Sequence, residues 1–375
     1  MAKINYKILD SINKIDRDNW DTVFGVIPES YPFYRALENS ELPEFRFYYL
    51  VIELDNEIVL IAPLFSTDFN LDIAAEGWIS KLIKSIRRIF PRFLIVRTLF
   101  CGTPFGEYGV LGIRQDFQKD PRLIPVLLAG LNDLSAKINA PLVIFKDFLK
   151  QNTPFLDILT TQGYSRVESF PAVSLALNFS SFEDYLRSLG SSTRKNLNKK
   201  LKQADIRGKI EVKVADDVRG QIDQIVKLYE DTYREGLTKF ERLTRKFFLR
   251  VADDLAGHTR FFLYYVDGKL AAFNLCFTYP DLLIDKFIGF DYDISNYYNL
   301  YFVSWAYNIK WCIENRLHYY HPGQTDYEPK IRLGGKLIPL YAYLKHKKLL
   351  FNLLIKLLIP FLKPENFDDD IRKAG

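Results

Sequence analysis

The stretch from Thr259 to Lys345 constrains the fold most, because its apolar runs follow one definite order. Three apolar, aromatic and β-branched runs come first, separated at 267–268 (Asp-Gly) and at 279–281 (Tyr-Pro-Asp). Such residues between such runs are typical of turns that join antiparallel strands. A helix is predicted next, from an apolar face formed by Leu300, Val303, Tyr307 and Trp311. Another strand at 318–321, a polar cluster with a short helix at 324–330, and a final strand complete the order.

The first half of the chain has a similar order with little sequence identity. Two strands at 45–53 and 57–65 are predicted to form a hairpin around Asp55-Asn56. A strand at 93–100, a helix at 121–138, a strand at 141–148, a short helix at 153–163 and a strand at 166–177 are predicted to follow. We interpret this order as an internal repeat of architecture. The alternative is one large α/β sheet whose two halves are similar by chance.

Composition sets the class of protein. A chain of 375 residues is long enough for two domains, and 48% hydrophobic and 15% aromatic residues support substantial cores. The net charge of +5 is too mild to imply nucleic acid by itself. Cys101, Cys276 and Cys312 are far apart and are typical of reduced thiols in a cytosolic protein. We expect neither a signal peptide nor a transmembrane helix, which favours a cytoplasmic location.

The middle of the chain is strongly basic. A helix at about 191–207 has Leu197 and Leu201 on an apolar seam. Its cations are Arg194, Lys195, Lys199, Lys200, Lys202 and Arg207. A nucleic acid or a nucleotide-bearing donor would meet this positive charge, because lysine and arginine neutralise phosphates. A solvated helix between two domains is the alternative.

Two other segments are cationic and apolar. The helix predicted at 78–90 carries Lys81, Lys84, Arg87 and Arg88 on its polar side. The tail at 346–363 is intensely apolar and includes lysines at 347, 348, 356 and 363. The tail is too short to span a bilayer but could lie in its interface. Docking on the protein's own core is an equal alternative for it.

Familiar catalytic motifs are missing. The glycine-rich segment 101–109 fits neither a Walker motif nor a dinucleotide fingerprint, so we expect a tight connection, with a phosphate-binding loop as the alternative. No Gly-x-Ser-x-Gly elbow occurs. His318 and His321 have a metal-like spacing, but in a strand they face opposite sides. Direct group transfer remains, which needs positioning, a proton acceptor and donors for an oxyanion.

The polar cluster suits such chemistry. Gln324, Tyr327, Glu328 and Lys330 offer an amide, a phenol, a carboxylate and an ammonium close together. Asp285 is a carboxylate in an apolar strand, where burial would raise its pKa towards that of a useful base. Glu328 and Lys330 could instead be an exposed pair, and Asp285 could bond a neighbouring strand.

These features together resemble the FemAB/FemX-like branch of the GNAT acyltransferase superfamily, and more narrowly the proteins with a BioF2-like (CelD-like) acetyltransferase domain. The resemblance covers about residues 10–345. The residues that carry it are Trp20, the segments 191–197 (SSTRKNL), 267–269 (DGK), 298–306 (YNLYFVSWA) and 323–330 (GQTDYEPK), and Leu333-Gly334.

The resemblance implies an α/β (α+β) fold of two tandem GNAT-like domains, each a mixed, mostly antiparallel sheet flanked by helices. We expect a first domain at 1–178, a second at 179–345 that begins with the basic helix, and a cationic amphipathic tail at 346–375. One departure concerns the usual pyrophosphate loop, Arg/Gln-x-x-Gly-x-Gly/Ala. Its place is taken by Asp291–Tyr298, which has no glycine. The Fem branch often lacks this motif too.

The resemblance also implies acyl or aminoacyl transfer to an amine or hydroxyl, often on a cell-envelope precursor. The donor would be acyl-CoA, an acyl carrier protein or aminoacyl-tRNA. No tightly bound cofactor is expected, and acyl-CoA would be a co-substrate. We expect no DNA partner. A peripheral contact between the tail and the inner face of the membrane is one of the two alternatives for the tail.

Eight residues form the predicted site in the cleft between the domains. The catalytic residues would be Asp285, Tyr327 and Glu328, with Tyr327 or Glu328 relaying the proton. The substrate-binding residues would be Arg194, Tyr292, Asn299, Gln324 and Lys330. The alternative is a non-catalytic protein that binds a lipid-linked or peptidoglycan precursor in this cleft. An RNA-binding protein that uses residues 194–213 is a third hypothesis.

Overall fold

The computed structural model describes residues 3–71, 77–236 and 241–374. Its strands form one sheet of 13 strands in the order β1-β2-β3-β4-β6-β13-β7-β12-β11-β10-β9-β8, with β5 beside β3. The strands of the first half are β1 (Ile4–Leu9), β2 (Arg46–Leu54), β3 (Glu57–Asn70), β4 (Ile95–Cys101), β5 (Gly112–Ile113), β6 (Leu142–Leu149) and β7 (Ser165–Ala176). Those of the second half are β8 (Ile210–Ala215), β9 (Thr259–Val266), β10 (Lys269–Tyr279), β11 (Leu282–Phe290), β12 (Tyr319–His321) and β13 (Lys336–His346).

The sheet is mixed and mostly antiparallel, as expected. Only β4 with β6 and β11 with β12 run parallel among the described strand pairs. The predicted hairpins at 55–56, 267–268 and 279–281 all form. The turn at Asp55-Asn56 has φ of 50° and 69°, and the turn at Asp267-Gly268 has φ of 49° and 78°. Two positive φ angles in succession match the twist of the flanking strands.

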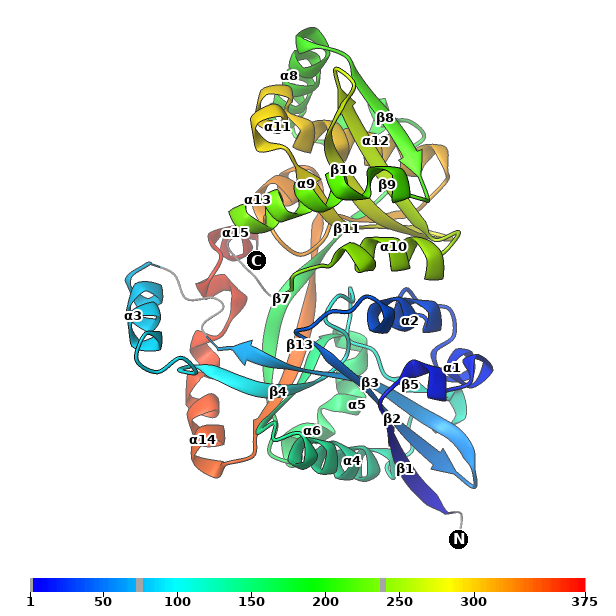
Figure 1. The fold of residues 1–375 in the computed structure, drawn as a ribbon, viewed down its shortest axis with the longest axis vertical. Helices are drawn as coiled ribbons and strands as arrows, with labels where there is room; N and C mark the ends of the chain where they lie inside the picture. Colours follow the sequence, from blue (N-terminus) through cyan, green and yellow to red (C-terminus); the bar gives the residue numbers. More distant parts are fainter. Residues whose placement is uncertain (1–2, 72–76, 237–240, 375) are drawn as a thin grey trace.

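Helices cover both faces of the sheet (Figure 1). Those of the first half are α1 (Arg17–Phe24), α2 (Tyr31–Asn39), α3 (Gly77–Arg87), α4 (Leu123–Lys137), α5 (Thr153–Leu156) and α6 (Ile158–Thr161). Those of the second half are α7 (Phe182–Ser188), α8 (Ser191–Arg207), α9 (Ile222–Glu235), α10 (Arg245–Asp254), α11 (Tyr292–Tyr298), α12 (Leu300–Glu314), α13 (Tyr327–Arg332), α14 (Leu349–Leu358) and α15 (Asp369–Ala374). Among the described helices, none is both long and apolar enough to cross a bilayer.

The two halves are joined through β13. This strand comes from the end of the second half, yet it lies between β6 and β7 of the first half and pairs antiparallel with both. In Figure 1, β7 and β13 run between the lower and upper parts of the sheet. The boundary at residue 178 stays a prediction, but the sheet of the first half is completed only by residues from beyond it.

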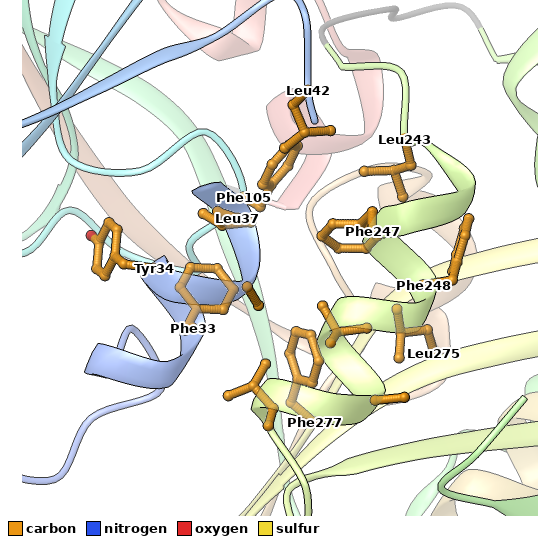
Figure 2. Close-up of a cluster of buried hydrophobic side chains, with 14 of the residues drawn as sticks. Phe33, Tyr34, Leu37, Leu42, Phe105, Leu243, Phe247, Phe248, Leu275 and Phe277 are labelled. Atoms are coloured by element: carbon orange, nitrogen blue, oxygen red, sulfur yellow. The ribbon is translucent and has the colours of Figure 1, made fainter. Parts of the chain in front are cut away.

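The halves also share a core. One continuous cluster of buried side chains contains residues of α1, α2, β2 and β3 together with residues of α9, α10, β9 and β10. Figure 2 shows its centre, where Phe33 and Leu37 of α2 lie opposite Phe247 of α10 and Phe277 of β10. The rings of Phe33 and Phe277 meet edge to face, 6.2 Å apart. Because this apolar surface belongs to both halves, their relative position is fixed by packing.

Candidate active site

Lys286 occupies a β-bulge in β11. Its neighbours Asp285 and Phe287 take successive places opposite β10, so Lys286 has no partner in that register. A bulge re-aims side chains, and here Phe287 packs against the shared core while Lys286 reaches towards the first half. Its Nζ donates a hydrogen bond to Glu107 Oε1 over 2.9 Å.

Glu107 lies in the glycine-rich segment 101–109, whose packing sets its position. A Cβ atom at Gly109 would lie 2.2 Å from the carbonyl oxygen of Lys146 in β6, so glycine is needed there for close packing. Phe105 of the same segment packs edge to face with Phe45 in the shared core, at a centroid distance of 5.6 Å. The segment is therefore a tight connection, as expected from the sequence.

The Glu107–Lys286 ion pair joins the two halves away from solvent. Only 3% of the Glu107 side chain and 13% of the Lys286 side chain are exposed. Burial alone would raise the pKa of Glu107, but Lys286 and His321 hold that pKa below its ordinary value. The backbone N–H of Glu107 donates to Glu29 Oε1 over 2.9 Å. Burial raises the pKa of Glu29, so two carboxyl groups with opposite pKa shifts lie beside one ammonium.

His321 of β12 completes this group. Its Nδ1 lies 3.8 Å from Glu107 Oε2, too far for a hydrogen bond, and neither atom has a hydrogen-bond partner among the described residues. Burial lowers the pKa of His321, and Glu107 offsets only part of that effect. The imidazole is thus neutral near pH 7. The Tyr108 ring stands edge-on to it, with the centroids 6.0 Å apart.

Lys330 of α13 extends the group. Its Nζ donates to the carbonyl oxygen of Gly323 over 3.3 Å and to that of Thr325. Burial lowers its pKa to about 8, so about a tenth of the Lys330 amine is neutral at pH 7. Gly323, with φ of 80°, is needed at this turn. The Nε2 atom of Gln324 is buried without a hydrogen-bond partner among the described residues, so a donor is free in the same turn.

Asp285 lies on the opposite face of β11 from Lys286, and burial raises its pKa, as expected. Its Oδ2 accepts hydrogen bonds from Asn274 Nδ2 (2.7 Å), Tyr320 OH (2.9 Å) and Asn308 Nδ2 (3.0 Å). Three donors on one oxygen fix the carboxylate between β10, β12 and α12. This network matches the alternative in which Asp285 bonds neighbouring strands. Its role as a base stays a prediction.

Tyr327 and Glu328 point away from this group. Tyr327 is buried with Val173 and Ile371, and its OH donates to the carbonyl oxygen of Pro171 over 2.9 Å. Burial raises its pKa far above the ordinary value for tyrosine. Glu328 is half exposed and pairs with Arg332 over 2.7 Å. The structure therefore brings neither residue together with Asp285 or Lys330.

The three remaining predicted residues lie around α8 and α11. Arg194, near the start of α8, donates to the carbonyl oxygen of Arg187 over 3.3 Å. Asn299, with φ of 52° between α11 and α12, donates to the carbonyl oxygen of Lys200 over 3.4 Å. Tyr292 is half-buried at the start of α11, and burial raises its pKa. Of the eight predicted residues, Asp285, Gln324 and Lys330 gather around the Gly323 turn.

The start of α11 is where the usual GNAT loop would meet a pyrophosphate. There the Asp291 carboxylate caps the helix by accepting from the backbone N–H of Ile294 over 3.4 Å, and it pairs with Lys269 over 2.7 Å. The Asp291 carboxylate thus already interacts with the positive end of the α11 dipole. These residues do not fit a coenzyme A pyrophosphate at that position.

Little open space adjoins the ion pair. A cavity of about 10 Å³, room for roughly one water, is lined by Glu29, Glu107 and Lys286 together with Pro28, Phe33, Phe105, Phe277 and Ile284. Among the described residues, no three His, Cys, Asp or Glu side chains are grouped to hold a metal ion.

Sequence reasoning missed Glu29, Glu107, Lys286 and His321. Glu107 lay in a segment singled out only for its glycines, and His321 was considered only for its spacing from His318. Lys286 was adjacent to the predicted Asp285, but no sequence signal marked the bulge that turns it towards the first half. Nothing in the sequence distinguished Glu29.

The chain has a tandem GNAT-like fold with an ionisable cluster at the junction of its halves. Residues 11–336 match the FemAB-like family, described as peptidoglycan biosynthesis/recognition, and the chain belongs to that family. A Mycobacterium tuberculosis protein with the provisional name 8-amino-7-oxononanoate synthase 2 is 26% identical over 84% of this chain. The match covers 42% of that protein, so the chain spans less than half of its curated relative.

Solved structures confirm the fold. FemX matches 94% of this chain and 99% of its own, with 11% identity and a TM-score of 0.56. The C-terminal domain of a lysylphosphatidylglycerol synthetase from Agrobacterium fabrum, so described provisionally, matches 94% and 97%, with 11% identity and a TM-score of 0.54. A tandem GNAT protein from the clavulanic acid biosynthesis pathway matches 92% and 99%, with 10% identity and a TM-score of 0.53.

Proposed function

We propose that this chain transfers an acyl or aminoacyl group from a thioester or an aminoacyl-tRNA to an amine or hydroxyl acceptor, such as a cell-envelope precursor. The observation that carries the proposal is the buried cluster of Glu107, Lys286, His321 and Lys330. The cluster combines residues of both halves. Among the described residues, polar atoms of Glu107, His321 and the neighbouring Gln324 have no hydrogen-bond partner. Ionisable groups whose pKa values are shifted by burial and by specific charged neighbours are candidates for catalytic roles.

The transfer would proceed by direct attack. The acceptor nitrogen or oxygen forms a bond to the donor carbonyl carbon, and the bond from that carbon to the donor sulfur or oxygen breaks. Neutral His321 or neutral Lys330 takes the acceptor proton and returns it to the leaving group. Glu107 stabilises the imidazolium that forms. The Lys286 ammonium and the Gln324 amide stabilise the oxyanion.

A covalent intermediate is no part of this proposal. Cys276 and Cys101 are buried, and burial raises the pKa of both thiols, so a reactive thiolate is disfavoured. The capped start of α11 favours a donor held by other means than a pyrophosphate loop there. The exposed cations of α8 could hold an aminoacyl-tRNA or another phosphate-bearing donor. The proposal places the chain in the cytoplasm, where such donors are made.

Donor consumption tests the proposal. Purified chain is mixed with acetyl-CoA or with labelled aminoacyl-tRNA, each with and without a UDP-linked peptidoglycan precursor. We expect acceptor-dependent loss of one donor. Lys330→Met should lower that rate about 100-fold or more, since positioned acid–base groups contribute on that scale. The exposed Lys336 gives the matched control, and Lys336→Met should keep the wild-type rate.

A precursor-binding protein without catalysis is the second candidate, since the matched family is described by recognition as well as biosynthesis. It would bind the UDP-linked precursor in a calorimetric titration yet consume neither donor. That result, or equal rates for Lys330→Met and wild type, would contradict transfer at this site.

A further inference from the structure

Helix α14 sits on the protein with its polar side inward. Its Asn352 is buried, accepts from the backbone N–H of His346 over 3.0 Å and donates to the carbonyl oxygen of Gly163 over 2.9 Å. Its leucines face the other way, and Leu350 and Leu357 are 68% and 70% exposed. This is the reverse of a helix docked on a core, where the apolar face is inward. The tail therefore does not bury its apolar face on the described part of this chain.

The outward surface of α14 is large and apolar. Between residues 349 and 362, nine large hydrophobic side chains are each at least 38% exposed. Exposed apolar side chains this dense mark a docking surface, whereas single exposed ones are ordinary. With ten residues, α14 is too short to cross a bilayer, but it can lie in the interface of one.

Charge indicates what covers this surface. Lys347, Lys348, Lys356 and Lys363 are exposed around it, and the chain has no Asp or Glu from 346 to 364. Helix α3 lies along the same edge of the molecule in Figure 1. In the segment that directly follows α3, Ile89 and Phe90 are exposed beside exposed cations. A second copy would bring the same lysines face to face and repel, whereas anionic headgroups would attract them.

We propose that the outward face of α14, with the residues that follow it to 363, docks on an anionic lipid surface. The helix lies in the interface, its leucines enter the acyl boundary, and its lysines meet the headgroups. This surface is separate from the Glu107–Lys286 cluster, and the inference does not depend on the transfer chemistry.

Vesicle co-sedimentation of the full chain tests the docking. The chain should pellet with vesicles of phosphatidylglycerol and phosphatidylcholine, more weakly with phosphatidylcholine alone, and less at high salt. Leu357→Glu and Leu350→Glu should each lower partitioning onto the vesicles about tenfold, since each removes one leucine side chain that the bilayer would bury. The control is Val26→Glu, at an 88% exposed residue outside this surface, which should bind as the wild type does.

Three results would overturn the inference. They are no pelleting of the wild type with either vesicle, equal partitioning of Leu357→Glu and the wild type, or a dimer in vesicle-free ultracentrifugation that Leu357→Glu converts to a monomer. The last result would make the surface a contact between copies. Circular dichroism should confirm that each variant is folded, as expected for changes at exposed positions.

Discussion

At the scale of single residues, the account depends on one buried ion pair. Lys286 and Glu107 come from different halves, and each has little water around it. The attraction between two buried charges offsets the cost of their desolvation only while both are present. Removal of one partner leaves a buried charge without compensation, so this pair affects stability far more than an exposed pair does.

Lys286→Met should therefore lower the free energy of unfolding by about 3–5 kcal/mol. Addition of Glu107→Gln should restore part of the lost free energy, because it removes the buried carboxylate that Lys286→Met leaves without a partner. The control is Lys269→Met, at a lysine that is 65% exposed and pairs with Asp291, and it should cost about 0–1 kcal/mol. Urea denaturation measures all three. A loss for Lys286→Met no larger than the control's would contradict the account.

Because of Lys330, the free energy of unfolding should change with pH in the alkaline range. Its pKa in the folded state is about 8, below the ordinary value of 10.5 in the unfolded chain. Between these values the unfolded state binds more protons, so rising pH favours the folded state. From about pH 8 to 10.5, the wild type should gain stability relative to Lys330→Met, and below pH 8 the difference should be constant. Denaturation at several pH values measures it, and a flat difference throughout would contradict this pKa.

At the scale of elements, strand and turn patterns were predictable because they depend on local sequence. The hairpins at Asp55-Asn56 and Asp267-Gly268 formed where their turn residues predicted. The segment 101–109 was also predicted as a tight connection, but its purpose was not. Its glycines permit contact with β6, and that contact sets where Glu107 points. Such contacts between distant segments leave no periodic signal in a sequence.

Gly109→Ala tests this role of the segment. The new Cβ would approach the carbonyl oxygen of Lys146 to 2.2 Å and the Phe148 ring to 2.6 Å, so we expect a loss of about 1–3 kcal/mol or more from overpacking. Gly220 is the control, because a Cβ there meets nothing within 4 Å, and Gly220→Ala should change stability by less than about 1 kcal/mol. Thermal unfolding compares them. Equal melting temperatures would contradict the tight packing.

At the scale of the whole molecule, the order of elements predicted a repeat of architecture, and the family resemblance predicted the mixed sheet and the tandem fold. The order of elements could not predict that β13 lies between β6 and β7, because the local sequence of a strand does not determine which distant strand it pairs with. The site has the same limit. Asp285, Gln324 and Lys330 were proposed from their residue types. Glu107 and His321 could not be, because only the packing of the two halves places them side by side.

The most direct test of the central claim compares two histidines of one short segment. His321 is buried beside Glu107, while His318 is 61% exposed and bonds Asp281 over 2.9 Å. With the donor and precursor pair that wild type consumes, His321→Gln should slow transfer about 100-fold or more, and His318→Gln should leave the rate unchanged. The pH profile separates the two candidate bases. The wild-type rate should persist below pH 6.5 with His321 as the base, because burial lowers the pKa of His321, and should fall below about pH 8 with Lys330 as the base. Equal rates for the two variants would contradict catalysis at the junction.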